Sequence, residues 1–82
     1  MSRGVRSLTS REVLRVLTVF GFEVVATRGS HAKLRRILPG GERQVLTVPL
    51  HRHLAPGTLR AIVRQATRYI PEGELRPLFF KD

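Results

Sequence analysis

The sequence contains no cysteine and no tryptophan, and it has only six Asp and Glu residues beside fifteen Lys and Arg. Without cysteine the chain has neither disulfides nor thiolate zinc sites to stabilise a small fold, and no redox chemistry that would indicate secretion. No run approaches the roughly 20 apolar residues of a membrane-spanning helix. The first ten residues are charged and lack the apolar stretch of a signal peptide. We therefore expect a cytoplasmic protein without a membrane segment.

The scarcity of acidic residues also weighs against several classes of enzyme. Six scattered carboxylates make a glycosidase-like pair or a Ser-His-acid triad difficult to assemble. Pro39-Gly40-Gly41 is not a phosphate-binding loop, because the lysine and the following helix of that motif are missing. His51 and His53 lie two positions apart, but no third His, Cys or carboxylate close in sequence completes a metal site. We expect neither a metal nor another cofactor.

Positive charge is the strongest compositional signal, with a formal net charge of +9 in 82 residues. So basic a chain favours a polyanionic partner, because Lys and Arg neutralise phosphates and release their counterions. Nucleic acid is our first interpretation and an acidic protein the second, and the two are compatible. The length fits a single domain over residues 1–82. Residues 1–7 are polar and basic and are expected to fray.

The apolar pattern predicts a helix at each end of the chain and strands between them. Thr9 and Glu12 form a capping box that predicts a helix from about Ser10, and Gly21 supplies its stop. Strands are expected over 22–27, 31–38 and 42–50, with turns at 28–30 and 39–41. A second helix is expected over 56–68, followed by a short helical turn, opened by Pro71, that carries Leu75, Leu78 and Phe79.

This order of elements predicts an α+β fold with the arrangement α-β-β-β-α. Each helix has one apolar stripe to bury, so we expect both on one face of a three-stranded antiparallel sheet. The other face is then left to solvent or to a ligand. Because alternate residues of a strand point to opposite faces, His31, Lys33 and Arg35 should face outward. Ala32 and Leu34 should face the helices.

An outward imidazole beside two cations is a minimal set of groups for cleaving RNA. The 2′-hydroxyl of the substrate can attack the adjacent phosphate, so no metal is required. What is required is a group that moves protons near neutral pH, and cations that stabilise the charge developing on the phosphorane. His31 supplies the first, and Lys33 and Arg35 supply the second. The spacing alone leaves a plainer interpretation open, in which His31 is a surface hydrogen-bonding residue on a solvated strand face.

Four short motifs occur in the order and spacing of one known family. They are Gly21-Phe22 after a capped helix, Gly29-Ser30-His31, Val48-Pro49-Leu50-His51, and Pro56-Gly57-Thr58-Leu59-Arg60 with Ile62 and Gln65. From about Ser10 to Ile70 the chain resembles the HicA (YcfA-like) mRNA interferase toxins. The resemblance implies a fold like that of a double-stranded-RNA-binding domain. It also implies a metal-independent endoribonuclease that cuts single-stranded RNA or mRNA.

The resemblance further implies an acidic HicB antitoxin that covers the active site, so we expect a monomer alone and a hetero-oligomer with the antitoxin. His31 takes the catalytic position of the family, and His51 matches its Pro-x-His position. The residues that we expect to bind RNA or to shape the site are Arg28, Gly29, Ser30, Lys33, Arg35, Arg36 and His51. Ala32 stands where many relatives carry a larger side chain, and His53 matches no family position.

Two rival functions remain open at this point. A non-catalytic RNA-binding module of the same fold would use the same surface, and Arg60 and Arg64 would matter more than His31. A protein-interaction subunit would carry its charge for an acidic partner alone, and its RNA affinity would vanish at physiological salt.

Overall fold

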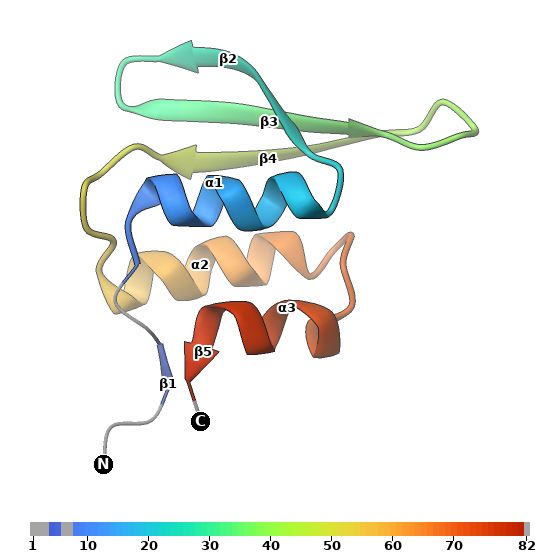
Figure 1. The fold of residues 1–82 in the computed structure, drawn as a ribbon. Coiled ribbons are helices and arrows are strands. Elements are labelled where there is room, and N and C mark those ends of the chain that lie inside the picture. The colour runs from blue at the N-terminus through green and yellow to red at the C-terminus, as the bar shows by residue number, and fades with distance from the viewer. Residues whose placement is uncertain (1–3, 6–7, 82) are drawn as a thin grey trace.

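A computed structural model describes residues 4–5 and 8–81 of the chain (Figure 1). Its elements are β1 (Gly4–Val5), α1 (Ser10–Val19), β2 (Glu23–Arg28), β3 (His31–Ile37), β4 (Arg43–Pro49), α2 (Pro56–Ala66), α3 (Glu72–Phe79) and β5 (Phe80–Lys81). Strands β2, β3 and β4 form an antiparallel sheet in that order, and β1 pairs with β5 in a separate ladder. The α+β class and the α-β-β-β-α order predicted from the sequence are confirmed.

Helix α1 begins where the capping box places it. The hydroxyl of Thr9 accepts the backbone N–H of Glu12 at 3.2 Å, and the Glu12 carboxylate accepts the backbone N–H of Thr9 at 2.9 Å. Two N–H groups that have no partner within the helix are thereby satisfied. The helix ends at Val19, and Gly21 follows with a φ of 93°, which glycine adopts without strain.

One core lies between the helices and the inner face of the three-stranded sheet. The largest fully buried side chains are Val13, Leu17, Phe22, Leu34, Leu46, Val48, Leu59, Ile70, Leu75 and Phe79. Along β3 the buried Ala32 and Leu34 alternate with the exposed His31 and Lys33, as the two-residue period of a strand predicts. Helices α1, α2 and α3 lie on one side of the sheet, so no described helix covers its other, open face (Figure 1).

The C-terminal region is more regular than the sequence predicts. Helix α2 ends at Ala66, and α3 is an eight-residue helix rather than a short turn. Leu75 and Phe79 are buried, whereas Leu78 is 37% exposed. Within the described residues, no helix has both the length and the apolar character needed to span a bilayer.

The N-terminal segment 1–7, which we expected to fray, is described only at Gly4–Val5. These two residues form β1, which pairs with Phe80–Lys81. The rest of that segment lies outside the described residues. A two-residue strand shows no hydrophobic period, so the pairing could not be predicted from the sequence.

Candidate functional site

The turn between β2 and β3 presents His31 at one end of the open sheet face. Arg28 pairs with His31, which leaves Gly29-Ser30 as a two-residue loop. Gly29 has a φ of 57°, a left-handed conformation that costs glycine nothing. The carbonyl of Ser30 accepts the N–H of Leu50 at 2.6 Å, which ties the turn to the end of β4. The position of His31 is therefore fixed by the backbone on both sides.

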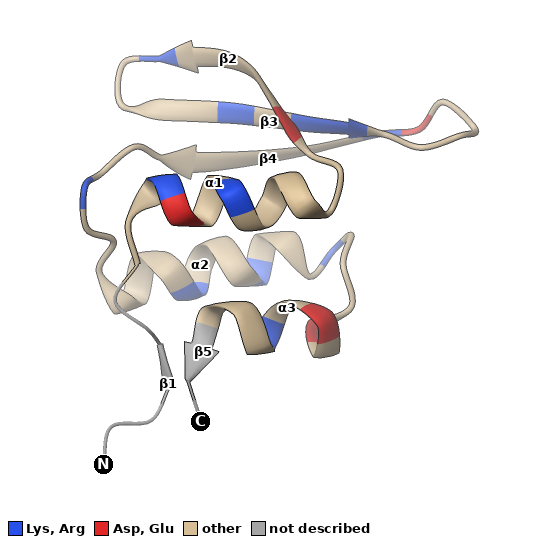
Figure 2. Cartoon of the chain, in the orientation of Figure 1, with Lys and Arg blue, Asp and Glu red and all other residues tan. Residues whose placement is uncertain are grey.

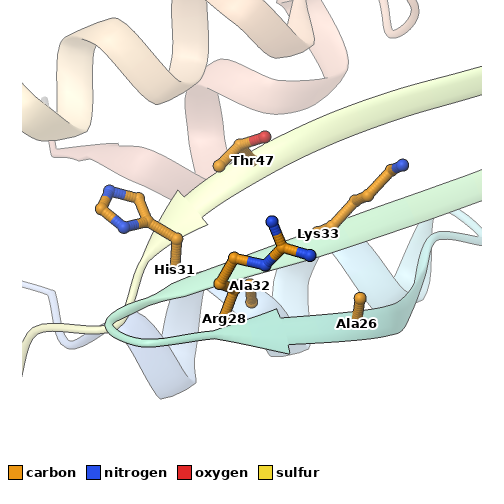
Figure 3. A pocket seen from close by; sticks show the side chains of 6 residues that line it. All are labelled: Ala26, Arg28, His31, Ala32, Lys33 and Thr47. Carbon is orange, nitrogen blue, oxygen red and sulfur yellow. The ribbon is translucent and has the colours of Figure 1, made fainter.

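A shallow depression of about 330 Å³ lies on the open face beside this turn. The residues that line it are Ala26, Arg28, His31, Ala32, Lys33 and Thr47. Figure 3 shows the side chains of Arg28, His31 and Lys33 rising from the same side of the sheet, with Thr47 on the neighbouring strand. Lys33 lies between Ala26 on β2 and Thr47 on β4. An imidazole, a guanidinium, an ammonium group and a hydroxyl thus share one concave surface.

The positive charge of this depression is not neutralised within the described part of the chain. Arg28, His31 and Lys33 are exposed, and their side chains form no hydrogen bond or ion pair with a described residue. None of the described residues that line the depression carries a carboxylate. Exposed and unpaired cations around a concave surface favour an anionic ligand.

Arg35 lies on the same sheet face but away from His31. A β-bulge between Val24 and Ala26 shifts the register of β2, so that Glu23 is the residue opposite Arg35. If the register of Arg28 and His31 continued unchanged, Val24 would occupy that place. Of the two cations that we expected to stabilise the phosphate, the structure brings Lys33 beside His31 and places Arg35 opposite a carboxylate.

Arg36 lies on the opposite side of the sheet from His31, among the helices. Its guanidinium donates to the carbonyls of Phe20 at 2.9 Å and Tyr69 at 3.1 Å. It also donates to the side-chain oxygen of Gln44 at 2.8 Å and lies 4.8 Å above the ring centre of Phe22. The structure therefore does not bring Arg36 to the face where we expected it to help dock RNA. Instead it joins the end of α1, β4 and the segment after α2.

His51 and His53 are also separate from the depression. They line a separate hollow at the start of α2, together with Leu54, Ala55 and Thr58. The backbone carbonyl of His51 accepts the N–H of Ser10 at 3.2 Å, which fixes this segment against α1. Among the described residues, no three His, Cys, Asp or Glu side chains form a group that could hold a metal ion.

Ala26 and Thr47 line the depression although neither was predicted from the sequence, and Thr47 is the polar one of the two. The side-chain oxygen of Gln65 on α2 accepts the backbone N–H of Thr47 at 3.0 Å. The side-chain nitrogen of Gln65 donates to the carbonyl of Thr47 at 3.2 Å. These bonds satisfy backbone groups on an edge strand and hold Thr47 opposite Lys33. A signal was available, because Thr47 alternates with the buried Leu46 and Val48.

One known protein family matches the part of the chain that contains the candidate site and most of the fold. The family model described as the HicA toxin of bacterial toxin–antitoxin systems matches residues 10–67, which include every residue that lines the depression. The searches of curated proteins and of solved structures gave no match. The family match covers more than half of the 82 residues. The chain therefore belongs to the HicA toxin family of bacterial toxin–antitoxin systems, with the toxin role and the antitoxin partner that this membership implies.

Proposed function

We propose that the chain is a metal-independent endoribonuclease that cuts single-stranded RNA or mRNA, with His31 as its general acid or base. The observation that carries the proposal is the depression on the open sheet face, where His31 lies with Arg28 and Lys33. Membership of the HicA toxin family supports it, because the resemblance of the chain to the HicA mRNA interferases implies RNA as the target. The net charge of +9 supports a polyanionic substrate.

In the proposed reaction, the 2′-hydroxyl of the substrate attacks the neighbouring phosphorus. The bond from O2′ to phosphorus forms as the bond from phosphorus to O5′ breaks, which leaves a 2′,3′-cyclic phosphate and a 5′-hydroxyl. His31 either accepts the proton from O2′ or donates the proton that O5′ requires, and water serves the other oxygen. Lys33 and Arg28 stabilise the charge on the phosphorane. Because His31 is exposed, it can exchange its proton with water between turnovers.

The remaining docking roles are assigned by position. Gly29-Ser30 shapes the turn that presents His31. Arg35, on the same sheet face, contacts a more distant part of the RNA strand. His51 lies in the hollow at the start of α2 and contacts RNA that leaves the depression. We leave Arg36 out of the RNA contacts, because its guanidinium already binds three oxygens on the other side of the sheet.

We further propose that the antitoxin is an acidic HicB-type protein that covers this depression. Its negative charge would complement the exposed cations and speed association. The toxin would then be a cytoplasmic monomer when alone and part of a hetero-oligomer when neutralised.

A non-catalytic RNA-binding module is the second candidate function. The observation that favours it is the exposed arginine row Arg60, Arg64 and Arg68 along and just beyond α2. Like charges four residues apart on a helix repel slightly, and an anionic ligand would relieve that repulsion. This candidate predicts salt-sensitive RNA binding without any cleavage product.

The first test is incubation of the purified chain with a long single-stranded RNA in excess EDTA, followed by analysis of the fragment ends. We expect fragments with 2′,3′-cyclic phosphate or 3′-phosphate ends and 5′-hydroxyl ends. Binding without fragments would favour the RNA-binding module. Fragments with 5′-phosphate and 3′-hydroxyl ends would contradict attack by the 2′-hydroxyl.

A further inference from the structure

A second basic hollow lies beside the candidate site, at the same end of the molecule. Its volume is about 510 Å³, and it is lined by Thr9, Ser10, Arg11, Leu50 and Arg52. In Figure 1 the start of α1, the segment after β4 and the turn between β2 and β3 lie at one end of the fold. Figure 2 shows basic positions in each of these three places.

Backbone hydrogen bonds hold this hollow next to the depression at His31. The N–H of Leu50 donates to the carbonyl of Ser30, one residue before His31, at 2.6 Å. The N–H of Ser10 donates to the carbonyl of His51 at 3.2 Å. The segment that starts at Leu50 is therefore fixed to the β2–β3 turn on one side and to α1 on the other. The depression at His31 and this hollow cannot move apart without breaking these bonds.

Arg11 and Arg52 are the charged groups of the second hollow. Both are exposed, and neither side chain forms a hydrogen bond or an ion pair with a described residue. The neighbouring Glu12 directs its carboxylate to Thr9, where it accepts the backbone N–H at 2.9 Å and the hydroxyl at 3.2 Å. Because this carboxylate completes the helix cap, an anion in the hollow would be bound by the two guanidinium groups rather than by the start of the helix. Guanidinium groups bind phosphate oxygens in a bidentate manner.

A single RNA strand carries a phosphate at every linkage, so a strand that crosses His31 brings further phosphates close to it. We propose that Arg11 and Arg52 form a second phosphate-binding subsite, which holds the RNA strand on one side of the linkage cut at His31. This inference rests on the proposed function, because it assigns the subsite to the same substrate. Contacts away from the reacting phosphate position the strand and supply binding energy.

The test compares two double variants that remove the same amount of charge. One is Arg11→Gln with Arg52→Gln in the second hollow. The control is Arg43→Gln with Arg76→Gln, two exposed arginines that line neither the depression nor the second hollow. Binding is measured by fluorescence anisotropy with a fully 2′-O-methylated RNA of twelve nucleotides, over a series of salt concentrations. This RNA has no free 2′-hydroxyl, so the measurement does not depend on cleavage.

We expect the Arg11 and Arg52 double variant to bind about tenfold or more weakly than the parent, and the control to change by less than about threefold. The slope of log K against log salt should fall by about 0.7 for each phosphate contact that is lost, hence by roughly 0.7 to 1.4. A third variant, Arg11→Lys with Arg52→Lys, should recover most of the slope because it keeps both charges. Thermal unfolding of each variant checks that the fold is retained.

The outcomes separate this subsite from the catalytic proposal. If the parent cuts RNA but the Arg11 and Arg52 variant binds as well as the control, the subsite is wrong and the proposed function stands. If the variant loses affinity and slope as expected while the parent never cuts RNA, the subsite stands and the catalytic role falls. Equal losses in the variant and the control would show a diffuse charge effect and would also overturn the subsite.

Discussion

Replacing His31 with alanine is expected to lower the rate of RNA cleavage by about two to four decades, the usual contribution of one acid–base group. The residue is exposed, and its side chain has no hydrogen bond with a described residue, so the free energy of unfolding should change little. The rate is measured under single-turnover conditions in excess EDTA, with the thermal midpoint of both proteins measured in parallel.

His53→Ala is the matched control for this prediction. His53 is also an exposed imidazole, but it lines the hollow at α2 rather than the depression. Its replacement should leave the cleavage rate within about threefold of the parent. A loss of less than threefold in His31→Ala, or equal losses in the two variants, would remove His31 from its assigned role.

Replacing Arg36 with alanine is expected to lower the free energy of unfolding by about 2 to 3 kcal/mol. The substitution leaves the carbonyls of Phe20 and Tyr69 without their donor, and a buried acceptor without a partner costs about 1 to 3 kcal/mol. It also removes the contact with the ring of Phe22, which contributes about 0.5 to 2 kcal/mol. Because Arg36 is half-buried, water offsets part of these losses. In a domain of this size the midpoint should fall by roughly 10 to 20 °C.

Arg35→Ala supplies the control for the stability measurement. Arg35 lies on the opposite sheet face from Arg36 and forms no hydrogen bond with a described residue. Its replacement should therefore lower the free energy of unfolding by less than about 1 kcal/mol. Arg36→Lys keeps the charge but not the planar fork of donors, so it should restore only part of the stability. Unfolding of Arg36→Ala at the same temperature as Arg35→Ala would contradict the structural role of Arg36.

The local features of this fold could be predicted because they depend on residues close in sequence. The capping box joins Thr9 and Glu12, three positions apart, and it places the start of α1 at Ser10. The alternation along β3 places His31 and Lys33 outward because a strand has a period of two. The same alternation places Arg36 inward, yet a charged residue is ordinarily expected at the surface.

The features that could not be predicted depend on contacts between distant segments. The carbonyls that hold Arg36 come from residues 16 and 33 positions away in the sequence. The bonds from Gln65 that fix Thr47 span 18 positions and require α2 to lie against the edge of the sheet. The bulge in β2 decides that Arg35 lies opposite Glu23, and no turn or glycine signal in the sequence marks it.

The antitoxin interface that we propose would use the same surface. A partner that covers the depression would exclude RNA from His31 and would neutralise Arg28 and Lys33 at the same time. The Arg11 and Arg52 hollow extends the cationic surface beyond Arg28, His31 and Lys33. An antitoxin could therefore gain affinity from cations that the proposed catalytic step does not use.

Attack by the 2′-hydroxyl of the substrate is tested with two versions of one RNA that differ only at the linkage that is cut. After the cut site has been mapped, the nucleotide on its 5′ side is replaced by its 2′-O-methyl form, and both RNAs are incubated with the protein in excess EDTA. We expect the unmodified RNA to be cut, whereas the modified RNA should be bound with similar affinity and stay intact at that linkage. Cleavage of the methylated linkage at a similar rate would exclude the 2′-hydroxyl of the substrate as the nucleophile.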